Sequence, residues 1–364
     1  MAIQKIQVFS IVLHYREPFI ISAGAAVETR NIVIKVTTDY DVFGWGEASP
    51  SKRVTNETAE TVLQALDKIA PHLIGMCPLR IEQINETMDK LVKGNSSAKA
   101  AVDIALHDIV GKTARRPLWR LMGGYREKVL TDITLSIKSP EQMAEDAAKA
   151  VRQGFRALKV KVGTSLKEDV ERVQLIREKA GSDIALRVDA NQAWSVEEAV
   201  KVFNCLEPFN IEFIEQPIAA NDVRGLARIK AESSIPVMAD EAIHSPRDAL
   251  HLILEDAVDL INIKLMKCGG VQNAKKIAAI AEAANVSCMI GCMGESQIGI
   301  AAAAHTAMAT KNICFADLDS DLLIENKLAD GIKLENSYRV PSQQSGLGLT
   351  EPNLKLLGKP LKTY

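Results

Sequence analysis

Short runs of apolar residues recur through the second part of the chain, and helical patterns fill the gaps between them. The runs are spaced by about 25 residues, which leaves room for one helix between neighbours. Amphipathic helices are expected in these gaps, for example at 140–153, 166–179, 196–206 and 274–284. Eight alternating units predict a parallel α/β barrel, and an open doubly wound sheet is the structural alternative. The runs that we interpret as barrel strands are 131–136, 157–162, 185–190, 211–215, 236–240, 260–264, 286–290 and 313–317.

The first part of the chain is organised differently, with strand patterns first and helical patterns after them. Three strand patterns predict an antiparallel meander at 6–14, 31–38 and 42–47. The stretch 18–27 between the first two is apolar, small and uncharged. We expect a loop there that either closes over an apolar ligand group or packs internally. Residues 58–120 then show a helical period, so residues 1–125 are predicted to form an α+β capping domain.

Past residue 324 the regular spacing is lost. Glycine and proline residues there predict an irregular tail, 325–364, that packs back on the first domain. The catalytic barrel domain is therefore expected to span residues 126–324, which gives an α/β protein with two parts.

Composition and charge exclude several functional classes. The 364 residues carry a net charge of −2, which gives no basic field for binding nucleic acid or an anionic membrane. No apolar run reaches membrane-spanning length, and the start lacks a signal-peptide core, so we expect a cytoplasmic protein. The six cysteines contain no CxxC pair and the histidines no HExxH. Any metal is therefore expected to be a hard ion held by oxygen.

Two lysines interrupt the apolar pattern of the second barrel strand. Lys159 and Lys161 lie two positions apart, so the strand period directs both side chains to one face. Burying an ammonium group without a partner is costly, so acidic groups are expected opposite them. The alternative is an edge strand with a solvated lysine face.

Charged residues also stand at the carboxyl ends of the following strands. Asp189, Glu215 and Asp240 end three successive strands, and Lys264 ends the sixth. Barrel enzymes place their chemistry at this rim. Three converging carboxylates repel one another without a cation, and oxygen ligands with open positions suit Mg²⁺. Any one of these acids alone would be explained by a helix cap or a rim salt bridge.

This order of charges suggests a reaction at a carbon next to a carboxylate. A substrate carboxylate held on the metal would have its α-carbon flanked by Lys161 and Lys264, one on each face. The metal and lysine charges are expected to lower the pKa of each amine towards the working pH. One lysine would remove the α-proton, the metal would stabilise the enediolate, and the other lysine would return a proton from the opposite face. The α-carbon would be inverted.

These residues resemble the enolase superfamily, in its muconate-lactonizing-enzyme-like subgroup, and within it the dipeptide epimerases. The resemblance rests on Gly44-Trp45-Gly46-Glu47, Lys159-x-Lys161, the three acids, and the segment 261–270 with Lys264 and Gly269-Gly270. It implies a modified TIM-type (β/α)7β barrel, one Mg²⁺ per subunit, and Lys161 and Lys264 as acid/base catalysts. It also implies that Lys159 supports the substrate carboxylate. Homo-oligomerisation is left open.

Further substrate contacts follow from the same resemblance. Asp317 and Asp319 end the eighth strand, and dipeptide epimerases use a similar Asp-x-Asp to hold the ammonium of the dipeptide; a helix cap is the alternative role. Glu295 is expected at the rim of the seventh strand, with a loop cap as its alternative. Thr134 is a candidate substrate contact whose hydroxyl would otherwise satisfy a local backbone group.

The side chain of the second substrate residue should lie near the loops of the first domain. Some Ala-Glu epimerases have an arginine in the loop that corresponds to 18–27, but here that loop, with Gly24, has no positive charge. The absence of that arginine favours dipeptides in which alanine is followed by a hydrophobic residue. Lys52 and Arg53 in the next loop are candidates to receive an acidic side chain, and Asp321 a basic one.

We therefore expect a Mg²⁺-dependent dipeptide epimerase, an isomerase acting on a small-molecule dipeptide. The alternatives are an L-Ala-D/L-Glu epimerase, or an N-acylamino acid racemase or cycloisomerase of the same subgroup. A catalytically silent barrel is not favoured, because both lysines and all three metal acids are present.

Overall fold

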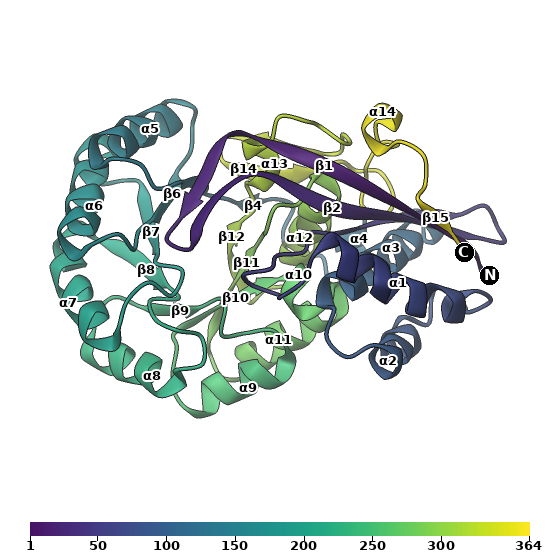
Figure 1. Cartoon of the computed structure of the whole chain (residues 1–364), viewed down its shortest axis with the longest axis horizontal. Helices are drawn as coiled ribbons and strands as arrows, with labels where there is room; N and C mark the ends of the chain where they lie inside the picture. The colour runs from purple at the N-terminus through teal and green to yellow at the C-terminus, as the bar shows by residue number, and fades with distance from the viewer.

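The barrel predicted from the strand spacing is confirmed. The computed structural model describes residues 1–364, and its largest sheet has eight parallel strands in chain order (Figure 1). A parallel bridge between Thr131 and Ala316 joins the last strand to the segment before the first. Because the strand order never reverses, the open doubly wound alternative is excluded. The strands are β5 (Ile133–Leu135), β6 (Ala157–Lys161), β7 (Ala185–Asp189), β8 (Ile211–Glu215), β9 (Val237–Ala239), β10 (Leu260–Lys264), β11 (Ser287–Gly291) and β12 (Ile313–Asp317).

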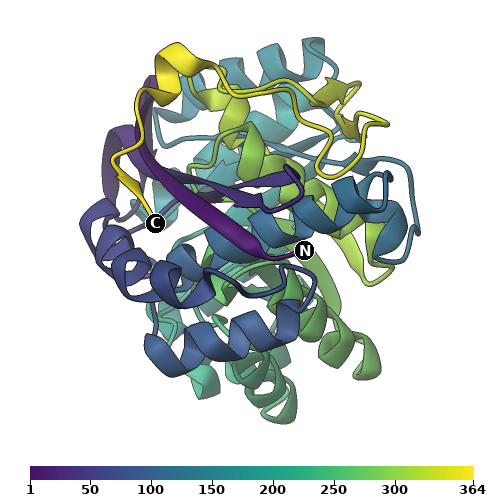
Figure 2. The ribbon, with the colours of Figure 1, turned by 90° about the vertical axis from the view of Figure 1, so that its right-hand side faces the viewer.

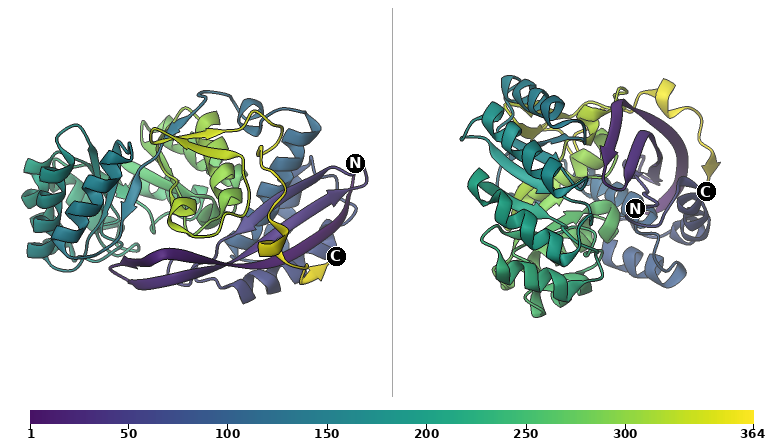
Figure 3. Two further views of the ribbon diagram at one scale, coloured as in Figure 1. Left: turned by 90° about the horizontal axis from the view of Figure 1, so that it is seen from above. Right: turned by 60° about the vertical axis from the view of Figure 1, so that its left-hand side comes forward.

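Long helices follow the first seven barrel strands and cover the outside of the barrel (Figure 3). Most begin after a serine whose Oγ accepts a hydrogen bond from a first-turn backbone N–H, which explains where each helix starts. A short helix, α10 (Leu265–Cys268), directly extends β10, and α13 (Ser320–Leu323) stands where an eighth long helix would be. This is a (β/α)7β barrel. The long helices are α5 (Pro140–Arg152), α6 (Leu166–Ala180), α7 (Val196–Leu206), α8 (Val223–Glu232), α9 (Pro246–Leu254), α11 (Val271–Ala283) and α12 (Gln297–Ala309).

The period of two along the strands separates the barrel interior into layers. Glu215 and Phe213 lie two positions apart on β8, so both point inwards, one above the other. Phe213 packs in a small apolar cluster with Met238, Leu260 and Met289. The cluster lies below the charged strand ends and shares this layer with buried Arg187, which is in register with Phe213 and is ion-paired with Asp132 and Glu212.

A four-stranded antiparallel sheet forms the core of the capping domain, in the order β15-β1-β2-β3, where β15 is Lys362–Thr363. The predicted loop at 18–27 is wrong, because β1 and β2 continue as a hairpin to a turn at Ser22-Ala23. Phe19 pairs with Ala26 and Ile20 with Ala25, since β-branched and aromatic residues favour strands. The long hairpin crosses the mouth of the barrel (Figure 1). The elements of this domain are β1 (Ile3–Ile21), β2 (Gly24–Thr38), β3 (Phe43–Ala48), α1 (Ala59–Leu73), α2 (Ile81–Leu91), α3 (Ser96–Thr113) and α4 (Leu118–Leu121).

Two glycines let strand β3 approach helix α3 closely. A Cβ on Gly44 would overlap the carbonyl oxygen of Ala105, and one on Gly46 that of Ala101. The Gly-Trp-Gly-Glu motif therefore has a packing reason, because only glycine permits this strand-to-helix distance. The following residue, Glu47, is thereby brought to the boundary with the barrel.

The tail is more ordered than predicted. A hairpin of β13 (Ile332–Glu335) and β14 (Tyr338–Pro341) pairs with β4 (Val129–Leu130). After the short α14 (Leu354–Leu357), β15 (Lys362–Thr363) pairs with the edge of β1. Both chain ends therefore lie at the capping sheet (Figure 2). No helix combines the length and apolar character that crossing a membrane requires.

Candidate active site

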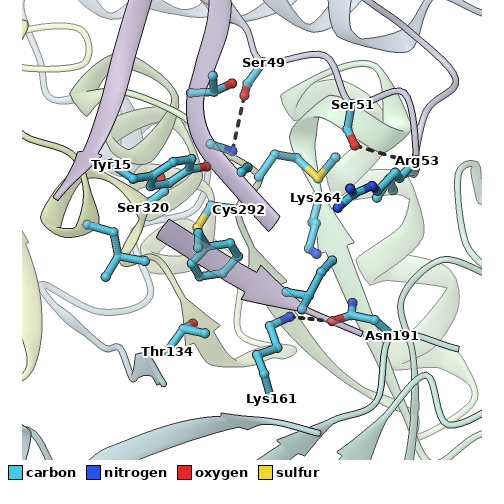
Figure 4. Close-up of a pocket in the computed structure, with 18 of the residues that line it drawn as sticks. Tyr15, Ser49, Ser51, Arg53, Thr134, Lys161, Asn191, Lys264, Cys292 and Ser320 are labelled. Carbon is cyan, nitrogen blue, oxygen red and sulfur yellow. Dashed lines mark hydrogen bonds between the residues drawn. The ribbon is translucent and has the colours of Figure 1, made fainter. Parts of the chain in front are cut away.

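A pocket of about 320 Å³ lies between the carboxyl ends of the barrel strands and the capping domain. Lys161 and Lys264 enter it from the barrel, whereas Tyr15 and Arg53 enter from the cap (Figure 4). Strand register explains the convergence, because Lys161 pairs with Asp189 and Asp189 with Glu215 across β6, β7 and β8. The structure therefore brings the predicted lysines and acids to one rim.

Lys159 lies at the centre of the acidic cluster. Its Nζ is 2.9 Å from Asp189 Oδ2, 2.8 Å from Glu215 Oε2 and 2.8 Å from Asp317 Oδ2. Only 1% of the residue is exposed, so the solvated-edge alternative is excluded. Burial lowers the lysine pKa, but these carboxylates outweigh it and hold the pKa of Lys159 well above its usual value. These contacts favour the ammonium form of Lys159.

Lys161 is held by one charged and one neutral partner. Its Nζ donates to Asp189 Oδ2 at 2.7 Å and to Asn191 Oδ1 at 2.9 Å. Asn191 has a left-handed backbone, with φ of 45°, and its Nδ2 donates to Glu241 Oε1 at 3.1 Å. The amide is therefore oriented from both sides. Two ammonium groups share Asp189, and although burial acts the other way, they lower its pKa to about 2.

Lys264 approaches from the opposite strand. Its Nζ donates to Asp240 Oδ2 at 2.7 Å, and the other oxygen of Asp240 binds the ammonium of Lys267. A side chain at Gly291 would contact Asn262 and Lys264, so this glycine leaves room for the lysine. The predicted lowering of the lysine pKa depends on a bound cation, and without one the balance at Lys264 is set by burial and Asp240. Burial lowers the pKa of Lys264, but the Asp240 carboxylate outweighs burial and raises it.

The three acids at the ends of β7, β8 and β9 fit a hard divalent cation. All are fully buried carboxylates, and Glu215 Oε2 accepts no well-formed hydrogen bond. Burial and the neighbouring Asp189 raise the pKa of Glu215 to about 7. The oxygens do not meet at one point in this structure, because Lys159 stands between Asp189 and Glu215 and two lysines hold Asp240. A bound cation would replace these ammonium charges and remove the effect that raises the pKa of Lys264.

A second cluster, Cys292, Asp317 and Asp319, has its ligand-type atoms within 4.8 Å of one another. It is a poorer metal site, because burial and the two aspartates raise the pKa of the Cys292 thiol well above its usual value. Asp317 is 4% and Asp319 3% exposed, and Asp317 Oδ1 is buried without a hydrogen bond. Free carboxylate oxygens that line the pocket suit an ammonium group.

Asp319 was predicted either to bind substrate or to cap a helix, and Thr134 either to bind substrate or to satisfy a backbone group. Asp319 is the residue before α13, but its side chain makes no capping hydrogen bond; its Oδ2 accepts one from the backbone N–H of Thr134 at 2.6 Å. Thr134 lines the pocket, as the substrate-contact role requires. Burial and the nearby negative charge of Asp317 raise the pKa of Asp319 to about 6.

Glu295 lies behind the pocket rather than in its lining. Its carboxylate accepts a hydrogen bond from the backbone N–H of Met293, as the loop-cap role requires. Burial and nearby Glu47 raise the pKa of Glu295 to about 8. Glu47 itself accepts hydrogen bonds from Ser296 N at 2.9 Å and Gly299 N at 2.9 Å, so it fastens the cap to the start of α12.

Four polar residues that contact the lysines and acids were not predicted as site residues: Asn191, Glu241, Asn262 and Lys267. Asn262 Nδ2 donates to Glu215 Oε1 at 2.7 Å, and it lies two positions before Lys264 on the same strand face. The strand period therefore contains the signal that identifies Asn262. Glu241 and Lys267 follow the strands, where no period applies, and only the folded chain reveals their contacts.

Comparisons with known proteins agree with this geometry. Residues 4–123 match the mandelate racemase / muconate lactonizing enzyme N-terminal domain, and residues 142–352 match the enolase C-terminal domain-like family. The hydrophobic dipeptide epimerase of Enterococcus faecalis is 42% identical, over 96% of this chain and 100% of that protein. The L-Ala-D/L-Glu epimerase of Bacillus subtilis is 38% identical, over 96% of this chain and 97% of that protein.

Solved structures give the same result. The Enterococcus faecalis dipeptide epimerase complexed with Mg and L-Leu-L-Tyr has a TM-score of 0.95 at 42% identity, over 96% of this chain and 100% of that one. The N-succinyl Arg/Lys racemase of Bacillus cereus has a TM-score of 0.96 at 37% identity, over 100% of this chain and 99% of that one. Both domains and their arrangement are matched, and the chain belongs to the enolase superfamily.

Proposed function

We propose that the protein is a Mg²⁺-dependent dipeptide epimerase that inverts the α-carbon of the second residue. The observation that carries the proposal is the placement of two lysines on opposite walls of one pocket, Lys161 from β6 and Lys264 from β10. A planar carbon between them is accessible to a proton donor or acceptor on each face. Inversion by 1,1-proton transfer requires this two-sided arrangement.

The acids and Lys159 account for binding of the reacting end. Asp189, Glu215 and Asp240 would hold the ion, whose chemistry is to offset the negative charge that develops on the substrate carboxylate. Lys159 adds a fixed positive charge beside the same carboxylate. One catalytic lysine takes the α-proton on its Nζ, and the other, protonated, donates a proton from the opposite side.

The other end of the pocket selects the free ammonium of a dipeptide. Asp317 and Asp319 line it and offer oxygens not already engaged by lysine. These charges repel an N-succinyl or other acidic N-acyl group. The cap hairpin covers the site, where Ile20 O accepts a hydrogen bond from Ile137 N at 2.9 Å, so bulk water is restricted during proton transfer.

Solvent exchange tests the proposal. L,L-dipeptides are incubated with enzyme and Mg²⁺ in deuterated water, and the α-proton of the second residue is followed by NMR. We expect loss of that signal together with appearance of the L,D-diastereomer. Exchange of N-acylamino acids but of no dipeptide would replace the proposal with a racemase, and exchange of neither would refute it.

A further inference from the structure

Two positive charges in the pocket, Lys52 and Arg53 of one cap loop, belong neither to the metal acids nor to the lysine pairs, and of these Arg53 lies against the hairpin tip. Arg53 is an exposed residue of the cap loop after β3 that lines the pocket, and no carboxylate lies within 4.0 Å of its guanidinium. By contrast, the buried lysines of the site are all paired with acids. An arginine without a counter-charge inside a binding pocket is free to bind an anionic group of a ligand.

The absence of a side chain at Gly24 leaves room for the guanidinium of Arg53. Arg53 Nη2 lies 2.5 Å from the point that a Cβ of Gly24 would occupy. Gly24 has a φ of +125° and begins β2 at the tip of the hairpin. Any side chain at this position would displace the guanidinium. The bare hairpin tip therefore accommodates a charge that comes from a different loop.

The charge lies away from the ammonium-binding end. In Figure 4 Arg53 reaches the pocket on the side of Lys264 and Asn191, whereas Thr134 and Ser320, the neighbours of Asp319, lie on the other side. When a dipeptide is held at both ends of its backbone, the side chain of its second residue points to the cap, because lysines and acids occupy the barrel rim. Phe19 and Ile21 of the hairpin supply apolar contacts for the methylene part of that side chain.

We infer that Arg53 is a specificity-determining residue and that the substrates are dipeptides whose second residue is acidic, such as glutamate. This inference rests on the proposed epimerase function and narrows its substrate class. The expectation of an apolar second residue rested on the absence of positive charge in the stretch 18–27. Arg53 supplies that charge from the neighbouring loop, beside Gly24.

The test compares three dipeptides of similar size: L-Ala-L-Glu, its neutral isostere L-Ala-L-Gln, and L-Ala-L-Met. We expect wild-type enzyme to epimerise L-Ala-L-Glu with the highest kcat/KM. Arg53→Met should lower kcat/KM for L-Ala-L-Glu by about 10- to 100-fold, mainly through KM, and change L-Ala-L-Gln by less than about threefold. Arg80→Met, which removes an exposed cap arginine outside the pocket, is the matched control.

Each other outcome has a defined meaning. Preference of the wild type for L-Ala-L-Met or L-Ala-L-Gln, or an equal loss for Glu and Gln in Arg53→Met, overturns the inference while the epimerase function stands. Loss in Lys52→Met instead of Arg53→Met also overturns it, because the anion would then bind elsewhere in the loop. Absence of exchange with every dipeptide refutes the proposed function itself.

Discussion

The two walls of the active site hold their lysines in different ways. On the β6 wall, Lys161 has an acidic partner, Asp189, and a neutral one, the amide of Asn191. On the β10 wall, Lys264 has only Asp240, and a second cation, Lys267, shares that carboxylate. A neutral partner orients an amine without fixing its charge, whereas a shared carboxylate couples two cations. The two directions of epimerisation should therefore respond differently to changes around each lysine.

Removal of either lysine is the most severe test of the comparison. Lys161→Ala and Lys264→Ala should each lower kcat for epimerisation by about 10²- to 10⁴-fold, because each removes one general acid/base. In each variant, α-proton exchange from one configuration should vanish while the other configuration still exchanges. NMR of L,L- and L,D-dipeptides in deuterated water measures both. Equal and complete loss for both configurations in two well-folded variants would leave the division of labour without support.

Metal binding tests the acids that the two walls share. Saturating Mg²⁺, at about 100 times its Kd, should stabilise the wild type by about 2.7 kcal/mol, measured by thermal denaturation with and without chelator. Asp189→Asn and Asp240→Asn each remove a ligand and should lose most of that gain. A wild-type Tm that does not change with Mg²⁺ would contradict the assignment of the three acids as metal ligands.

Asn191→Ala addresses the neutral partner on the β6 wall alone. Loss of its hydrogen bond to Lys161 should slow exchange by about tenfold for the configuration that Lys161 deprotonates. Exchange of the other configuration, measured in the same variant, is the internal control. Both rates falling together would mean that Asn191 acts on the fold and not on the orientation of Lys161.

In enzyme loaded with Mg²⁺, which keeps Glu215 ionised, acidification should weaken substrate binding through Asp319. Burial and Asp317 raise the pKa of Asp319 to about 6. As the pH falls through this value Asp319 becomes neutral, so its attraction for the substrate ammonium is lost and KM should rise severalfold. Asp319→Asn should have a high KM that no longer changes with pH in this range. A flat KM profile for the wild type would remove Asp319 from ammonium binding.

The smallest expected effect concerns stability and lies outside both walls. Burial and Glu47 raise the pKa of Glu295 to about 8 in the folded protein. A raised carboxyl pKa contributes stability below the unfolded value, and that stability is lost as the pH rises through the folded value. Glu295→Gln should therefore be more stable than wild type above about pH 8, by on the order of 1–2 kcal/mol. Urea denaturation at acidic and alkaline pH measures the difference, and identical pH profiles would count against the raised pKa.

Much of the barrel and its rim could be predicted, because both depend on local periodicity. Apolar runs bounded by helices identify strands, and the position of a charge at a strand end identifies the rim, as for Asp189 and Lys264. The enolase superfamily resemblance rests on such residues. The hairpin tip was mistaken for a loop, because Gly24 and its small neighbours carry no strand period.

Contacts between separate loops could not be predicted in this way. The approach of Arg53 to Gly24 and the pairing of Asn191 with Glu241 join residues on different connections. Their proximity is set by how the hairpin and the rim loops are packed. The direction of the pKa shift of Lys264 could not be predicted either. It depends on the balance between burial and the Asp240 carboxylate, and therefore on the distance between Lys264 Nζ and Asp240 Oδ2, which the sequence does not contain.

The pairing of β15 with β1 has a consequence for biosynthesis. Val8 on β1 meets Lys362 across roughly 350 residues of chain. At about 5–20 residues per second, that edge of β1 stays without its neighbour for on the order of 20–70 s of translation. Open strand edges recruit other strands, so the nascent capping domain is a predicted client of chaperones at the ribosome until the barrel has been made.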